Sequence, residues 1–141
     1  MSNWACQFIL KWIRLNQRQF VLSKMIHIIH ECYRLQNYAA VVPLLFALEN
    51  ASIARLKQTW QGLPSTDVTI LGQLIKVFSP LENWKTYRMA LAHNKPPLIP
   101  FLGLALQGLT FIEDGNPEFV GSGLVNWKRT QMVAQLINEI R

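Results

Sequence analysis

Four potential metal ligands lie close together in the sequence: His27, His30, Glu31 and Cys32. If this stretch is helical, residues three apart share a face, so two of these side chains could reach one ion. A zinc site needs further ligands, however, and neither an HExxH spacing nor a second cluster supplies them. We therefore interpret these residues as ordinary core and surface side chains, and predict no metal site.

The sequence carries no motif for covalent catalysis. It has no phosphate-binding loop of the GxxxxGK[ST] type and no serine in a nucleophile elbow. Glu113 and Asp114 are adjacent, so on a helix they point about 100° apart and make a poor acid–base pair. The residue types give no argument for covalent chemistry, and no cofactor is predicted.

The chain is basic, with a net charge of +6 and a pI near 9.7. Such a charge favours an acidic partner, which could be a protein, a nucleic acid or an anionic lipid surface. The lysines and arginines are spread along the chain, with no basic run interleaved with aromatics and no zinc-finger spacing. We therefore predict a solvated basic surface and no direct nucleic-acid binding.

The composition is apolar, because half of the residues are hydrophobic and only 16% are charged. Globular domains usually carry about 25% charged residues. A membrane helix needs about 20 apolar residues, whereas Ala39–Leu48 is shorter and Leu98–Ile112 is interrupted by proline, glycine and glutamine. The apolar surplus therefore predicts a surface that faces a partner.

The compartment follows from two further features of the sequence. No charged N-terminal region followed by an apolar run and a cleavage site opens the chain, so a secretory signal is not predicted. Cys6 and Cys32 are too few for a disulfide framework and fit a reducing compartment. The predicted localisation is cytoplasmic.

Apolar residues recur every three or four positions through most of the chain, which is the spacing of amphipathic helices. Pro43 lies within a segment that is apolar all round, as a buried helix is, and it removes one backbone hydrogen bond. Three prolines between Lys95 and Pro100 predict an extended connector. The helical segments up to this connector are predicted at residues 3–15, 17–35, 38–48, 52–60, 69–78 and 82–93.

Two further helices are predicted after the connector, over residues 101–112 and 124–140. The first ends where Gly115, Asn116 and Pro117 stop a helix. A loop around Gly121 and Gly123 joins the two as a helical hairpin. No strand-like alternation competes. The sequence therefore predicts an all-α helical bundle that ends in a protruding helical hairpin, in a single domain over residues 1–141.

Five sequence blocks, in order and at plausible spacings, resemble the catalytic domain of Ras-type guanine-nucleotide exchange factors (the RasGEF family). Together they cover essentially the whole chain. The blocks are LQNY (35–38) with ASIARLKQTW (51–60), SP (79–80) with NWKTYR (83–88), PPLIPFLG (96–103), LTFIEDGNP (109–117) and VNW (125–127).

The resemblance implies an all-helical domain whose helical hairpin wedges into a Ras-subfamily small GTPase and releases its GDP without covalent chemistry. It further implies membrane proximity through the GTPase, with recruitment to the inner face of a membrane. Three of the implied positions, Val42, Trp84 and Phe101, form an apolar pocket for the second switch of the GTPase. The implied GTPase-binding residues are Val42, Glu49, Trp84, Phe101 and Phe111.

The same resemblance places Thr110 and Asp114 where the hairpin approaches the magnesium and phosphate site of the GTPase. A carboxylate there repels the phosphates, and an apolar segment at the magnesium position removes the ligands of the ion. Because an exchange factor binds the nucleotide-free GTPase best, it lowers the nucleotide affinity by linkage. Thr110 and Asp114 are therefore the predicted catalytic positions.

The sequence departs from the family pattern at three places. Ala39 and Glu49 stand where the family usually has asparagine or a similar amide, and Pro43 replaces a helix-friendly residue. The resemblance also begins part way into the family's domain and ends before its closing helices, so residues 1–141 are expected to be a truncated catalytic domain. The alternative is a non-catalytic relic or scaffold that binds a GTPase or another protein. A third possibility is a peripheral membrane binder that uses its basic surface.

Overall fold

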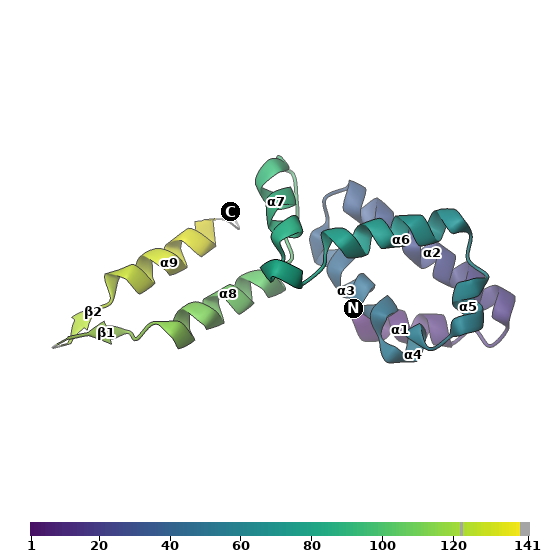
Figure 1. Cartoon of the computed structure of the whole chain (residues 1–141), viewed down its shortest axis with the longest axis horizontal. Helices are drawn as coiled ribbons and strands as arrows, with labels where there is room; N and C mark the ends of the chain where they lie inside the picture. The colour runs from purple at the N-terminus through teal and green to yellow at the C-terminus, as the bar shows by residue number, and fades with distance from the viewer. Residues whose placement is uncertain (122, 139–141) are drawn as a thin grey trace. The chain divides into compact units, whose positions relative to one another are not determined.

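The computed structural model describes residues 1–121 and 123–138, which form two compact units, one up to Pro100 and one from Phe101 onwards (Figure 1). The first unit contains α1 (Ser2–Leu10), α2 (Leu15–Arg34), α3 (Tyr38–Glu49), α4 (Ala51–Ala54), α5 (Lys57–Gln61), α6 (Ser65–Val77), the 3-10 turn η1 (Leu81–Asn83) and α7 (Lys85–His93). The second contains α8 (Leu102–Gly115), β1 (Phe119–Val120), β2 (Leu124–Val125) and α9 (Trp127–Asn138). The predicted all-α class is confirmed.

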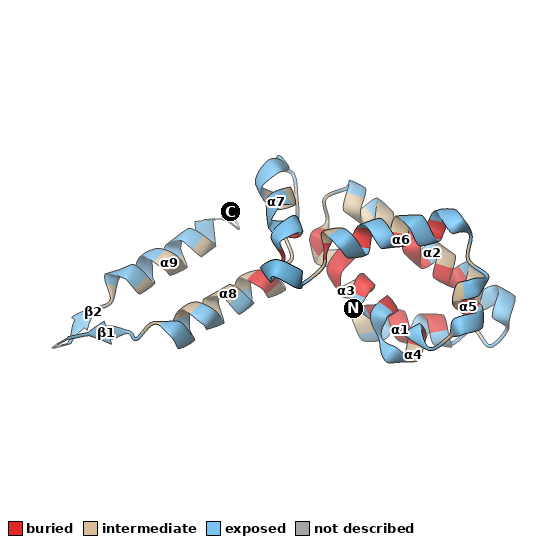
Figure 2. Cartoon of the chain, in the orientation of Figure 1, coloured by how far each residue is buried: buried red, intermediate tan, exposed pale blue. Residues whose placement is uncertain are grey.

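Helix α3 forms the centre of the first unit. It packs against both α1 and α2, and most of its residues are buried (Figure 2). The Asn37 side chain accepts a hydrogen bond from the Ala40 amide and caps its start. The helix continues through Pro43, whose carbonyl accepts a hydrogen bond of 2.7 Å from the Ser2 hydroxyl. The prediction of a buried helix here is confirmed.

An aromatic cluster joins α7 to the rest of the first unit. The Tyr87 ring lies 5.4 Å from Tyr38 and 5.4 Å from Phe78, and Tyr33 completes the group. The Asn94 amide donates to the Tyr38 hydroxyl. Burial raises the pKa of the Tyr38 phenol above its ordinary value.

The proline-rich connector between α7 and the end of the unit is held against the start of α3. Ile99 pairs with Asn37 as a short parallel bridge. The Ile99 carbonyl accepts from the Tyr38 amide at 2.9 Å, and the Ile99 amide donates to the Gln36 carbonyl at 2.9 Å. The extended connector predicted from its prolines is confirmed.

Several helix boundaries differ from the prediction: the segment predicted at 52–60 forms two helices, α4 and α5, and α9 begins at Trp127 because residues 124–125 form β2. Two further differences have a clear local cause. Helix α1 ends at Leu10 instead of residue 15, and the Arg18 guanidinium donates to the Trp12 and Ile13 carbonyls of the turn that follows. Helix α7 begins at Lys85 instead of residue 82, because residues 82–84 all have positive φ. Left-handed residues cannot continue a right-handed helix.

The second unit is a helical hairpin with α8 and α9 side by side, as predicted (Figure 1). The Asn126 side chain accepts from the Arg129 amide and donates to the Pro117 carbonyl, which fixes the start of α9. The prediction that no strand occurs was wrong. Phe119 pairs with Val125 and Val120 with Leu124 in a short antiparallel ribbon. The last predicted turn, residues 139–140, lies outside the described residues.

A buried carboxylate ties α6 to α2. Asp67 is 1% exposed, and its Oδ1 lies 3.1 Å from His27 Nε2. We expect His27→Ala to lower the free energy of unfolding by about 1–3 kcal/mol, because it removes the closer of two partners of the buried Asp67 Oδ1, which also accepts from the Thr66 hydroxyl at 3.4 Å. The matched control is His30→Ala, whose ring lies 3.8 Å from the exposed Glu31 carboxylate, and it should cost less than about 1 kcal/mol. Urea unfolding of both variants measures the difference, and equal losses would contradict a structural role for the His27–Asp67 contact.

Candidate functional site

One row of exposed side chains runs along α8. Leu106, Thr110 and Asp114 are spaced four residues apart, so they lie on one face of the helix, and all three are exposed. The Thr110 hydroxyl donates to the Leu106 carbonyl at 3.1 Å. Helix α9 packs on a different face, where Gly108 lies close to the Leu136 side chain. The hairpin therefore holds both predicted catalytic residues on a surface that α9 leaves open.

The two neighbouring acidic residues of α8 have different surroundings. Glu113 Oε1 lies 3.5 Å from Arg129 Nη2 on α9, so its charge is partly balanced. Asp114 is exposed and forms no ion pair within the described ranges, 1–121 and 123–138. Asp114 thus presents an uncompensated negative charge in a chain that is basic as a whole.

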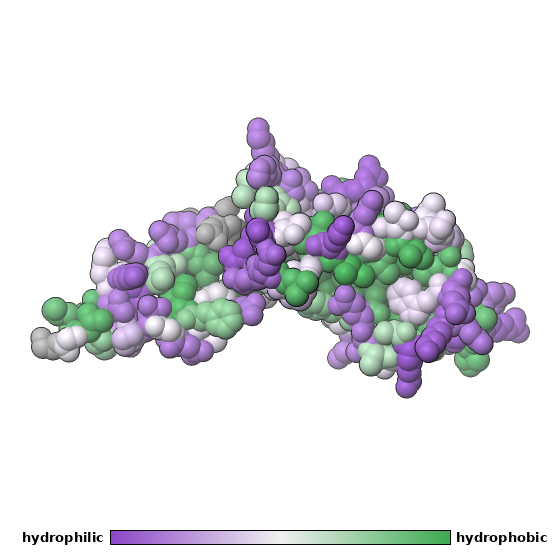
Figure 3. Space-filling view, viewed as in Figure 1, coloured by the Kyte–Doolittle hydropathy of each residue, from purple (hydrophilic) through white to green (hydrophobic). Residues whose placement is uncertain are grey.

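Apolar side chains extend this exposed surface of the second unit. Phe111, next to Thr110, is 60% exposed, and Leu102 is also open to solvent. Hydrophobic residues gather around the β1–β2 end of the hairpin (Figure 3). Exposed apolar surface of this kind marks an interaction site.

In the first unit, three of the predicted residues lie around a residue that the sequence analysis did not single out. Val42 and Phe46 are four residues apart on α3 and Glu49 three further on, so the three share a face. The Trp84 ring meets the Phe46 ring edge to face, with centroids 6.1 Å apart. Phe46 is 42% exposed.

Val42 and Trp84 are buried beneath this face. Val42 has no exposed surface, so Phe46 is the exposed apolar side chain on this face of α3, beside the exposed carboxylate of Glu49. Trp84 is held by left-handed backbone, with φ 60° and ψ 30°, a conformation that is unusual for a bulky residue. Such backbone outliers concentrate at functional sites.

Glu49 lies at the edge of a hollow of about 320 Å³ in the first unit. Leu48, Trp60, Leu71 and Ile75 line much of it, and the Trp60 indole N–H is already bound to the Ile53 carbonyl at 3.0 Å. The Glu49 side chain is exposed and makes no ion pair with any residue that the structure describes. It can therefore accept a hydrogen bond from a partner.

Phe101 is the N-cap residue of α8, and its ring covers Gly103. A Cβ at position 103 would lie only 2.4 Å from the ring, so a glycine is required for this ring position. Phe101 is partly exposed at the start of the helix that carries Thr110 and Asp114. The structure thus places Phe101 at the opposite end of α8 from Asp114.

The four residues that first suggested a metal site do not share a partner. His27 contacts Asp67, whereas His30 lies near Glu31. Burial, with a smaller contribution from Glu31, raises the pKa of the Cys32 thiol, which makes it a poor nucleophile. In the described part of the chain, no three such side chains converge on one point.

The RasGEF domain family matches residues 1–131 of the chain. Ras guanine nucleotide exchange factor C of Dictyostelium discoideum is 35% identical over 133 residues, which cover 94% of this chain and 9% of that protein. Ras-specific guanine nucleotide-releasing factor 2 of Mus musculus and factor 1 of Homo sapiens are each 33% identical over 141 residues, covering all of this chain and 12% and 11% of those proteins.

The chain belongs to the RasGEF domain family. The resemblance found in its five sequence blocks is confirmed. The chain spans only about a tenth of the length of the relatives named above. No helix within residues 1–121 and 123–138 is both long and apolar enough to cross a bilayer.

Proposed function

We propose that this chain is a guanine-nucleotide exchange factor for a Ras-subfamily small GTPase and promotes GDP release by protein–protein contact alone. The observation that carries the proposal is the exposed α8 row, in which Thr110 and Asp114 stand beside exposed Leu106 and Phe111, and Asp114 has no ion-pair partner among the residues that the structure describes. Family membership and the names of the relatives, which are Ras exchange or releasing factors, support the same activity.

The chemistry of this row suits displacement of a bound nucleotide. In a site of intermediate dielectric, a carboxylate and a phosphate oxygen about 4 Å apart repel each other by roughly 4 kcal/mol per pair of unit charges. The neighbouring Leu106 and Phe111 offer magnesium no oxygen ligand, and magnesium requires oxygen ligands in octahedral geometry. Occupation of the nucleotide site by α8 therefore disfavours both the phosphates and their ion, and nucleotide release follows from linkage.

Binding energy in this proposal comes from apolar anchors outside the row. Phe46, backed by Trp84, is an exposed aromatic side chain of the type that dominates interfaces. Glu49 supplies an acceptor on the same face of α3. The pocket for the second switch, formed by Val42, Trp84 and Phe101, stays a prediction.

The direct test is release of a fluorescent guanine nucleotide from Ras, Rap, Ral and Rho-type GTPases in the presence of excess chain. We expect release to accelerate with chain concentration for at least one Ras-subfamily member and for no Rho-type protein. A folded, helical chain that accelerates no member of the panel would contradict the proposal. Circular dichroism of the same sample establishes that it is folded.

The alternative is a scaffold that binds a GTPase without accelerating release, and Glu49 is the observation that favours it. The family usually carries an amide here, which both donates and accepts, whereas a carboxylate only accepts. If Glu49 weakens the contact, Glu49→Gln should raise the exchange rate about threefold to tenfold, equivalent to about 1 kcal/mol. Glu118→Gln, which removes the same charge from an exposed loop, is the control. An unchanged or lower rate for Glu49→Gln would show that the carboxylate does not limit the contact.

A further inference from the structure

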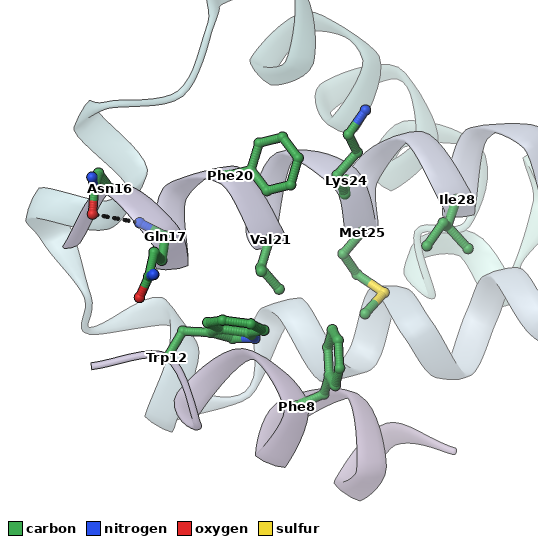
Figure 4. A pocket seen from close by; sticks show the side chains of 9 residues that line it. All are labelled: Phe8, Trp12, Asn16, Gln17, Phe20, Val21, Lys24, Met25 and Ile28. Carbon is green, nitrogen blue, oxygen red and sulfur yellow. Dashed lines mark hydrogen bonds between the residues drawn. The ribbon is translucent and has the colours of Figure 1, made fainter. Parts of the chain in front are cut away.

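An apolar groove of about 650 Å³ lies between α1 and α2 in the first unit (Figure 4). One wall is formed by Phe8 of α1 and by Trp12 in the turn that follows. The other wall is formed by α2, whose Val21 and Met25 point toward Phe8 and Trp12, and Phe20 and Ile28 of α2 also line the groove. None of these residues belongs to the faces of α3 and α8 described above.

The groove walls remain open to solvent although they are strongly apolar. Phe20 is 62% exposed and Ile28 is 50% exposed. On the α1 side, the Phe8 ring meets the Trp12 ring edge to face at 6.4 Å and stacks on Trp4 at 5.6 Å, so the aromatic row continues along the helix. Exposed aromatic rows of this extent mark a docking surface.

The dimensions of the groove suit an α-helix. Its α2 wall runs from residue 16 to residue 28, which at 1.5 Å per residue is about 18 Å. A docked helix of that length has about three turns and presents apolar side chains every third or fourth residue, as in other helix-in-groove complexes. Phe20, Lys24 and Ile28 repeat at intervals of four along the wall and match this period.

The one charged residue among those that line the groove, Lys24, is positive. The first acidic residue of the sequence is Glu31, whereas Lys11, Arg14, Arg18 and Lys24 all precede it. Arg18 is bound to the Trp12 and Ile13 carbonyls. Lys24 lines the groove itself, with its amine 5.4 Å from the centre of the Phe20 ring. Lys24 therefore offers a positive charge beside the apolar wall.

We propose that this groove docks an acidic amphipathic helix of a protein partner other than the GTPase. The apolar face of that helix contacts Phe8, Trp12, Phe20 and Ile28, and its acidic flank faces Lys24. A second copy of this chain is a poor occupant, because joining two copies at this groove would bring the Lys24 residues of both copies into one interface without an acidic partner among the lining residues. The inference does not rest on the proposed exchange activity.

The test uses a dye-labelled synthetic helical peptide of four turns, with leucine at every third or fourth position and glutamate along its flanks. Fluorescence anisotropy is expected to show binding to the whole chain. Phe20→Asp should weaken that binding more than tenfold, and Lys24→Glu should weaken it about threefold to fivefold at low salt. A second peptide with lysine in place of glutamate should bind the unmodified chain more weakly and should gain affinity for Lys24→Glu.

Two controls separate docking from misfolding and from exchange activity. Val68→Asp introduces the same charge on the exposed surface of α6 and should leave peptide binding unchanged. Phe20→Asp should keep the helical circular dichroism of the parent chain and its rate of nucleotide release. Peptide binding can therefore be absent while exchange activity is present, and exchange activity can be absent while peptide binding is present.

Three results would overturn the inference. The first is equal binding of the glutamate and lysine peptides, which would remove the charge complementarity. The second is unchanged peptide binding by Phe20→Asp, which would place the docking elsewhere. The third is no binding of either peptide together with sedimentation on phosphatidylserine vesicles that Phe20→Asp abolishes. That outcome would assign the groove to a membrane surface.

Discussion

Replacing Asp114 by asparagine is expected to slow nucleotide release from the GTPase by about tenfold to a hundredfold, while the affinity for the nucleotide-free GTPase changes less than about threefold. The side chain keeps its size and loses only its charge. If the charge acts against the phosphates, its loss removes a repulsion of a few kcal/mol that exists only while nucleotide is bound. The measurement pairs stopped-flow release of a fluorescent nucleotide with titration of the nucleotide-free GTPase.

The adjacent Glu113 provides a matched control for this experiment. Glu113→Gln removes the same charge one residue away, but it breaks an exposed contact of 3.5 Å to Arg129. Such surface pairs contribute at most about 1 kcal/mol, so neither exchange nor folding should change much. Equal slowing by both variants would indicate a general field effect of the hairpin. Equal loss of binding and exchange in Asp114→Asn would remove the specific role of Asp114.

Much of the fold follows from local sequence features. The spacing of apolar residues located the main helices of both units, and the prolines before Phe101 located the connector. The ribbon at β1 and β2 was missed because each strand has only two residues, too few to show alternation. The ends of α1 and α7 depend on the Arg18 hydrogen bonds and on three left-handed residues, which helical periodicity does not encode.

The candidate site also contains residues that could be predicted from the sequence and residues that could not. Thr110 and Asp114 were predicted from the family resemblance, and they share one face because α8 continues to Gly115, three residues beyond the predicted end. Phe46 was missed because an aromatic residue within an apolar helix resembles a core residue. Its position four residues after Val42 and three before Glu49 was the available signal. The pairing of His27 with Asp67 joins residues far apart in the chain, so local spacing could not indicate it.

The second large effect is expected at Phe46. Phe46→Ala should weaken binding to the nucleotide-free GTPase by about thirtyfold or more, which corresponds to the loss of a hot-spot side chain worth about 2 kcal/mol or more. The ring is 42% exposed and contacts Trp84, so the variant loses partner-facing apolar surface together with an aromatic contact of about 0.5–1.5 kcal/mol. Surface plasmon resonance measures the affinity, and thermal unfolding measures the change in stability.

Phe20→Ala is the control, because it truncates the same residue type at another exposed position of the first unit. The two proposals predict opposite results for the two variants. Phe46→Ala should weaken GTPase binding and leave binding of the acidic peptide unchanged, whereas Phe20→Ala should weaken peptide binding and leave GTPase binding unchanged. These opposite results would distinguish the loss of a specific interface from a general loss of structure, since a destabilised chain would bind both ligands more weakly. If Phe46→Ala binds the GTPase as tightly as the parent chain, then the contact surface does not include this face of α3. The proposed role of Trp84 in supporting the Phe46 ring for binding would then also be wrong.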